Sequence, residues 1–90
     1  MLTYKASYRM HMGAFSALVL DFPEASAFGA TLGEARNNLL LALRYAAERK
    51  LRKGELLPMP DAQAGDAEAY LVEPVTVWPT AADRVNVHVG

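Results

Sequence analysis

The chain has 90 residues, of which 52% are hydrophobic and 21% charged, with a formal net charge of −1 and no cysteine. This length allows one domain with one core, and so apolar and nearly neutral a composition excludes wholesale disorder. The lack of cysteine excludes disulfides and thiolate metal sites, and the charge balance disfavours a binder of polyanions, so direct binding to DNA is not expected.

The sequence indicates a soluble cytoplasmic protein that does not enter a membrane. Its first residues show no signal peptide, and its longest apolar runs, Ala17–Leu20 and Leu39–Leu43, are far shorter than the ~20 residues of a membrane-spanning helix. A chain of this size buries only about 64% of its surface on folding, which leaves a small margin of stability. We therefore expect a homo-oligomer, either a dimer or a tetramer.

The first part of the chain is expected to form an antiparallel hairpin. Residues 2–11 alternate between apolar and polar, which predicts a strand with one buried face. The residues expected on that face are Leu2, Tyr4, Ala6, Tyr8 and Met10. A Met-Gly pair then indicates a turn, after which Ala14–Leu20 resumes as a second strand. Pro23 ends the pairing because it cannot donate a backbone hydrogen bond, and Ser26–Gly29 is expected to be a short third strand.

A long helix is predicted next, with a signal at each end. Thr31 and Glu34 form a capping box, in which the Thr31 hydroxyl accepts from the amide of position 34 and Glu34 reaches back to the Thr31 amide. The helix should end near Arg52, where basic residues favour the negative end of the helix dipole. Gly54 suits the position just past this end.

The helix carries an apolar stripe that should face the sheet. The stripe, at i, i+3 and i+4 spacing, comprises Leu32, Ala35, Leu39, Leu43, Ala46 and Ala47. Leu40, Leu41 and Tyr45 widen it beyond what one sheet face should cover. We expect these three residues to lie either under a later segment of the chain or against another subunit.

The last part of the chain adds two predicted strands. Tyr70–Trp78 is typical of a strand, in which Pro74 favours an edge position or a bulge. After a turn at 79–83, Arg84–Val89 alternates again, and we expect it to pair with Tyr70–Trp78 or with an edge strand of another chain. The fold class is thus α+β: an antiparallel sheet of order β-β-β-α-β, with an extra C-terminal strand and one main helix on one face. The expected single domain, residues 1–90, divides into a hairpin-and-helix core (1–60), a loop (61–69) and C-terminal strands (70–90).

No residue pattern predicts catalysis, a metal site or a cofactor. The first strand contains no acidic residue, and most carboxylates fall in expected loops, whereas metal-dependent hydrolysis needs several that converge. His11 and His88 lie on polar strand faces and lack metal-ligand spacing. The serines lack a nucleophile elbow, and no glycine-rich phosphate loop is present.

Residues 15–60 carry an ordered set of features. An aromatic hairpin strand leads to Asp21-Phe22-Pro23, then Gly29-Ala30-Thr31, then Gly33-Glu34-Ala35 at the start of the helix, and Gly54 and Pro58-x-Pro60 follow the helix. In this order and spacing the chain resembles the HicB-like antitoxin family. The residues that match the family pattern, most of them with a structural interpretation, are Asp21, Pro23, Gly29, Thr31, Glu34 and Ala35.

The resemblance implies a partial ribonuclease-H-like fold that has lost its catalytic carboxylates. It also implies a binding protein that neutralises a small, basic, mRNA-cleaving toxin of the HicA type. Many members of the family add a C-terminal DNA-binding domain, which we do not expect here because the chain ends in a β segment.

Three functional hypotheses are compatible with these patterns. The first is a non-enzymatic antitoxin-like protein that occludes its partner with an exposed strand edge and surplus apolar helix surface. The second is a stand-alone oligomeric scaffold or ligand sensor on the same fold. The third is a residual metal-dependent nuclease that would depend on Asp21. The residues proposed for contact with a partner or a second copy are Trp78, Val85, Val87, Val89, Leu40 and Tyr45.

Overall fold

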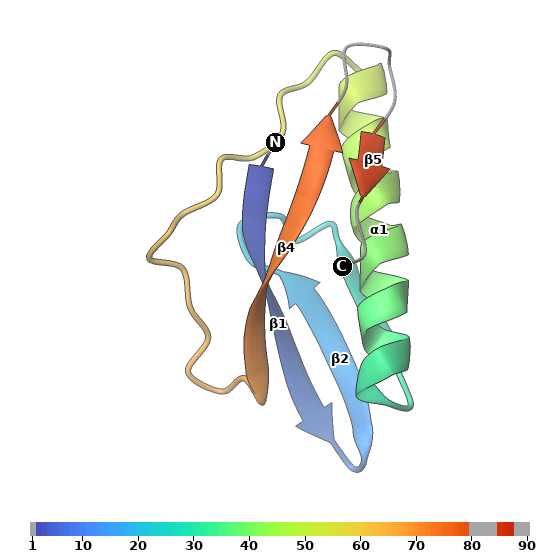
Figure 1. Ribbon diagram of the computed structural model, residues 1–90, viewed down its shortest axis with the longest axis vertical. Helices are drawn as coiled ribbons and strands as arrows, with labels where there is room; N and C mark the ends of the chain where they lie inside the picture. Colours follow the sequence, from blue (N-terminus) through green and yellow to red (C-terminus); the bar gives the residue numbers. More distant parts are fainter. Residues whose placement is uncertain (1, 80–84, 88–90) are drawn as a thin grey trace.

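The computed structural model describes residues 2–79 and 85–87, with side chains described for residues 2–77 (Figure 1). Its elements are β1 (Leu2–His11), β2 (Ala14–Val19), β3 (Ser26–Gly29), α1 (Leu32–Arg52), β4 (Leu71–Pro79) and β5 (Val85–Val87). The strands form one antiparallel sheet in the order β3-β2-β1-β4-β5, and α1 lies along one face of it. The predicted α+β fold with one main helix is confirmed.

The hairpin of β1 and β2 is closed by a tight turn. His11 pairs with Ala14, so only Met12 and Gly13 connect the strands, and both have positive φ, 52° and 82°. Two successive positive φ angles are typical of a type I′ turn, whose twist matches that of the flanking strands. β2 ends at Val19, one residue before the predicted end.

The N-terminal cap of α1 differs in one detail from the prediction. Thr31 is the N-cap, and its Oγ1 accepts a hydrogen bond from the Glu34 amide at 3.1 Å. The Glu34 carboxylate, however, accepts from the amide of Ala30 at 3.5 Å, not from that of Thr31.

The C-terminal end of α1 is a Schellman motif, with Gly54 at the predicted position just past the helix. Gly54 has φ 73° and donates to Leu51 O at 3.0 Å, while Glu55 donates to Lys50 O at 2.9 Å. These two bonds satisfy carbonyls that the helix leaves free at its end. Within residues 2–79 and 85–87, no helix combines the length and the apolarity that crossing a membrane requires.

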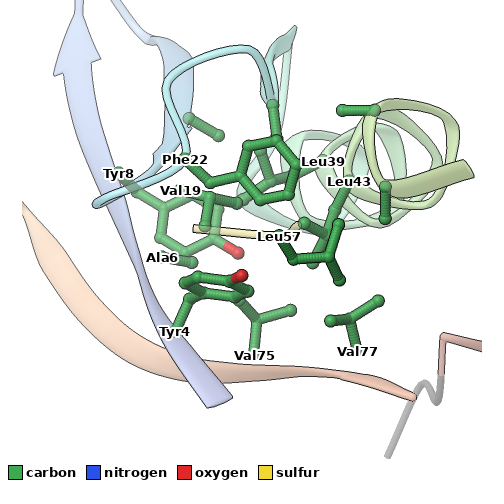
Figure 2. Packing of buried hydrophobic residues seen from close by; sticks show 14 of the residues in the cluster. Tyr4, Ala6, Tyr8, Val19, Phe22, Leu39, Leu43, Leu57, Val75 and Val77 are labelled. Atoms are coloured by element: carbon green, nitrogen blue, oxygen red, sulfur yellow. The ribbon is translucent and has the colours of Figure 1, made fainter. Parts of the chain in front are cut away.

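The core fills the space between α1 and one face of the sheet (Figure 2). Its largest fully buried side chains are Tyr4, Phe22, Leu39, Leu43, Val19 and Val77. The Tyr4 and Phe22 rings meet edge to face at 5.7 Å between centroids. The predicted helix stripe is buried except for Leu32, which is partly buried against the core.

One residue expected in the core is exposed. Met10 shares a face of β1 with Tyr4 and Tyr8, but its exposed fraction is 51%. It pairs with Phe15 next to the hairpin turn, and this end of the hairpin extends past the start of α1 (Figure 1). Alternation along a strand therefore gave the correct face, but only the position of the helix decides how much of that face is covered.

The C-terminal strands resolve an alternative that the sequence left open. β5 pairs with β4 of the same chain, with Val77 opposite Val87 and Pro79 opposite Val85. Pro79 thus extends β4 instead of opening the expected turn, whose residues 80–83 lie outside the described residues, as do Arg84 and Val89. Pro74 lies on a stretch of β4 that pairs with β1 but not with β5, which agrees with the predicted edge position.

Candidate interaction surfaces

The residues that match the family pattern near the β2–β3 turn hold the backbone. Asp21 has φ 70°, and its Oδ2 accepts a hydrogen bond from the Asp61 amide at 2.9 Å, which ties the segment after α1 to this turn. Phe22 is fully buried, whereas Pro23 is exposed. No group of three or more His, Asp or Glu side chains that could hold a metal ion occurs in the described part of the chain, so nothing there places Asp21 in a metal site.

β3 and the first turn of α1 are in close backbone contact. A Cβ atom at Gly29 would lie 2.4 Å from the Ala35 nitrogen and 2.8 Å from the Glu34 Cβ, so only glycine fits there. Ala35 is fully buried at this contact. The Asn38 side-chain amide donates to the Phe28 carbonyl at 2.7 Å.

The hydrogen bond from Asn38 to the Phe28 carbonyl occupies part of the exposed strand edge that the first hypothesis expects to bind a partner. Among the described residues, β3 is the outermost strand on its side of the sheet, and it has four residues. The Phe28 carbonyl that could accept from an added strand is already bonded to Asn38. A short edge with an occupied acceptor is a poor template for another strand, so side chains, not the β3 backbone, offer the better contact surface here.

The face of the sheet opposite α1 is partly covered by the segment between α1 and β4 (Figure 1). Asp66 of this segment forms hydrogen bonds to two residues of β1. Its carboxylate accepts from Ser7 Oγ at 2.6 Å and from Arg9 Nε and Nη2 at 2.9 and 2.8 Å. These hydrogen bonds hold the pKa of Asp66 well below its usual range, because they favour the charged form. Lys5 adds two bonds, from Nζ to the carbonyls of Ala62 and Ala64.

A hollow of about 440 Å³ remains beside this segment, on the face opposite α1. Its lining includes Ser7, Ser16, Leu18, Ser26, Phe28 and Asp66. Phe28 is 76% exposed and Leu18 37% exposed, although both are large and apolar. The register places Phe28 opposite Ser16 and Leu18 opposite Ser26, so the two apolar side chains are diagonal neighbours on this face.

The proposed contact residues lie on two different sides of α1. Leu40 is partly buried against the core, four residues after Arg36, which forms an ion pair with Glu73 of β4 at 2.8 Å. Leu40 therefore shares the β4 side of the helix with Arg36. Tyr45 is 64% exposed and follows Asn38 by seven residues, on the side of β3.

The remaining proposed contact residues are near the C-terminus. Trp78 lies in β4 and Val85 and Val87 in β5, a strand that contacts α1; their side chains, and Val89 altogether, lie outside the described part. The structure therefore brings Leu40 toward the C-terminal strands but separates Tyr45 from them.

Sequence reasoning missed Asp66 and Phe28. Leu18 and Leu20 on an otherwise polar strand face were a signal that this face is not simply solvated. Asp66 gave no local signal, because its partners Ser7 and Arg9 lie 59 and 57 residues away.

The arrangement can be compared with known proteins. No protein-family model matches the chain, and no curated protein matches it. The crystal structure of the N-terminal domain of the Burkholderia pseudomallei antitoxin HicB is similar, with a TM-score of 0.71 and 20% sequence identity, over 84% of this chain and 98% of that chain. The chain therefore has the fold of the N-terminal domain of a HicB antitoxin.

Proposed function

We propose that this protein is a non-enzymatic, antitoxin-like binding protein that neutralises a small HicA-type mRNA-cleaving toxin by occluding it. The observation that carries the proposal is the similarity to the HicB domain, which extends over almost all of that domain. The described residues support a binding role, since their acidic side chains form ion pairs, caps and turn contacts and do not converge as a hydrolytic metal site requires.

The surface proposed for the toxin is the hollow on the face opposite α1. Ser7 and Asp66 in its lining are already hydrogen-bonded to each other at 2.6 Å, so a partner would not leave them unpaired. Phe28 is an exposed aromatic side chain on a strand whose backbone is held against α1 at Gly29 and by Asn38. Aromatic side chains of this kind carry a large share of the energy of protein interfaces.

The test uses the purified protein and a HicA-type ribonuclease encoded in the same genome. We expect stoichiometric inhibition of RNA cleavage, and no cleavage by this chain alone. Phe28→Ser should raise the dissociation constant of the complex about tenfold or more, as measured by calorimetry. Leu56→Ser is the matched control, because Leu56 is 92% exposed and is not among the residues that line the hollow.

The outcomes separate the hypotheses. Lack of any complex, or a genome without such a ribonuclease, would contradict the antitoxin role. Magnesium-dependent cleavage by the chain alone, lost in Asp21→Asn, would establish the nuclease instead. Inhibition that survives in Phe28→Ser with unchanged affinity would retain the function but exclude the hollow as its surface.

A further inference from the structure

We propose that a pocket at the C-terminal end of α1 binds a phosphate monoester carried by an aromatic body, as in a nucleoside monophosphate. The pocket has a volume of about 180 Å³ and lies between the last turns of α1, the turn before β3 and the chain just after the helix. It shares no lining residue with the hollow proposed for the toxin, so the two proposals are independent. The charged and aromatic residues that line it are Glu24, Tyr45, Arg49, Lys50, Lys53 and Glu55.

The pocket carries positive charge that its own carboxylates do not neutralise. Both carboxylates bind the same cation, because Lys50 Nζ lies 3.1 Å from Glu24 Oε2 and 3.5 Å from Glu55 Oε1. Among the side chains of residues 2–77, no carboxylate forms an ion pair with Arg49 or Lys53. These two cations are therefore available to an anion from outside the chain.

The other charged residues near this end of the helix lie outside the pocket. Around the helix, positions 46, 50 and 53 lie on one side of Arg49, and Glu48 and Arg52 lie on the other. The Glu48 carboxylate forms ion pairs with Arg44 at 3.2 Å and with Arg52 at 3.8 Å. Glu48 is thus occupied by two cations that do not line the pocket, and it leaves the charge of Arg49 unpaired.

Arg49 is held in place by an aromatic ring. Its guanidinium lies 5.7 Å from the centroid of the Tyr45 ring, at a distance typical of a cation–π contact. Tyr45, Arg49 and Lys53 follow one another at spacings of four residues, so they form one row along the helix. The row offers an aromatic ring, a planar fork of donors that suits two phosphate oxygens, and a second cation.

The charge and the ring together indicate the class of ligand. A phosphate monoester carries a charge of about −1.5 to −2 at pH 7, which matches two unpaired cations better than the single charge of a carboxylate does. Tyr45 is 64% exposed, so its ring also offers area on which a base can stack. The net charge of −1 disfavours a long polyanion, and a small phosphorylated molecule is therefore the ligand that fits.

The position of the pocket limits its affinity. It lies at the negative end of the helix dipole, which opposes an anion. The last carbonyls of the helix do accept hydrogen bonds, from the amides of Lys53, Gly54 and Glu55. We therefore expect weak binding, with a dissociation constant on the order of 0.1 to 1 mM.

Titration of the whole chain with adenosine 5′-monophosphate, followed by NMR of the backbone amides, tests the proposal. We expect saturable shifts around the pocket, weaker binding of inorganic phosphate and no binding of adenosine. Arg49→Gln should raise the dissociation constant about tenfold or more, because it removes a charge-assisted hydrogen bond. Arg52→Gln is the matched control, since it removes the same charge three residues away, outside the lining, and should change the constant less than about twofold. Circular dichroism would verify that both variants fold.

Tyr45→Leu tests the aromatic part of the proposal. This variant removes the ring but keeps an apolar side chain, so it should weaken binding of adenosine 5′-monophosphate about fivefold or more and leave that of inorganic phosphate nearly unchanged. Equal affinity of the wild type for these two probes would assign the pocket to free phosphate and refute the aromatic body. The absence of saturable shifts, or equal weakening in Arg49→Gln and Arg52→Gln, would overturn the site altogether. Phe28→Ser should leave binding of the nucleotide unchanged, which separates this proposal from that of the toxin surface.

Discussion

Gly29, the last residue of β3, lies in close backbone contact with the first turn of α1. A methyl group there would meet the backbone of Ala35 at 2.4 Å, and a backbone cannot move aside as a flexible side chain can. Gly29→Ala should therefore lower the free energy of unfolding by about 1 to 3 kcal/mol through overpacking. Urea denaturation checks this, with Gly65→Ala as the control because a Cβ atom at Gly65 meets nothing within 4 Å. Equal stability of the two variants would contradict the close contact.

Asp66 makes stability depend on acid pH. Its pKa is lowered in the folded protein, first by the hydrogen bonds from Arg9 and then by that from Ser7. A lowered pKa contributes stability that is present above the unfolded value, 3.8, and is lost as the pH falls below it toward the folded value. Wild type should thus lose more stability between pH 7 and pH 3 than Asp66→Asn does.

Denaturation at both pH values measures that difference, and Glu68→Gln is its control. The Glu68 side chain is 78% exposed and its closest approach to Arg9 is 4.0 Å, so its removal should leave the acid dependence nearly intact. Asp66→Asn will not abolish the dependence, because two other carboxyl groups also have lowered pKa values. The ion pair with Arg36 lowers the pKa of Glu73, and a backbone hydrogen bond, followed by the bond from Lys50, lowers the pKa of Glu24. The same acid loss in wild type and Asp66→Asn would show that Asp66 does not hold the segment to the sheet.

At the scale of elements, the segment between α1 and β4 belongs to the core even though it has no regular structure. Leu57 is 9% exposed and packs in the core cluster, whereas the adjacent Leu56 is 92% exposed. Leu57→Ala should cost about 2 to 5 kcal/mol of unfolding free energy, and Leu56→Ala less than about 0.5 kcal/mol. Thermal and urea denaturation of this neighbouring pair measure the difference. Similar losses in both variants would mean that the segment is not anchored as described.

At the scale of the whole molecule, two buried phenols make the stability of the fold depend on pH in the alkaline range. Burial, and then the charge of Asp21, raises the pKa of Tyr4 to about 12, and burial followed by the charge of Glu73 raises the pKa of Tyr8 to about 12. Because these values are raised in the folded state, the stability they contribute is complete below pH 10 and is lost as the pH rises through 12. The protein should therefore unfold in this alkaline range.

Absorbance of tyrosinate during a pH titration, with circular dichroism in parallel, follows this process. The phenols of Tyr4 and Tyr8 should ionise together with the loss of structure. Tyr4→Phe should remove one of these two ionisations and also the hydrogen bond from the Tyr4 hydroxyl to Pro58 O at 2.6 Å. Ionisation of both phenols near pH 10 in a chain that keeps its structure would contradict their burial.

Much of the fold could be predicted because neighbouring residues specify it. The alternation of residues 2–11, the turn at Met12 and Gly13, the Thr31 cap and Gly54 each act within a few residues, and each was found where expected. The candidate surfaces could be predicted only in part. Tyr45 was expected to lie under a later segment or against another subunit, and in the single chain it is exposed. Phe28 was not singled out, since its exposure depends on which strand lies at the edge.

The sequence by itself determined the order of the elements, the type of fold and the ends of the helix, because local backbone preferences and apolar spacing decide these. The tertiary structure alone decided which faces are covered. Ser7, on a strand face expected to meet solvent, is 3% exposed because Asp66 reaches it from 59 residues away, and Met10 is exposed because the helix begins short of it. Coverage is a contact between distant segments, and no pattern within either segment encodes it.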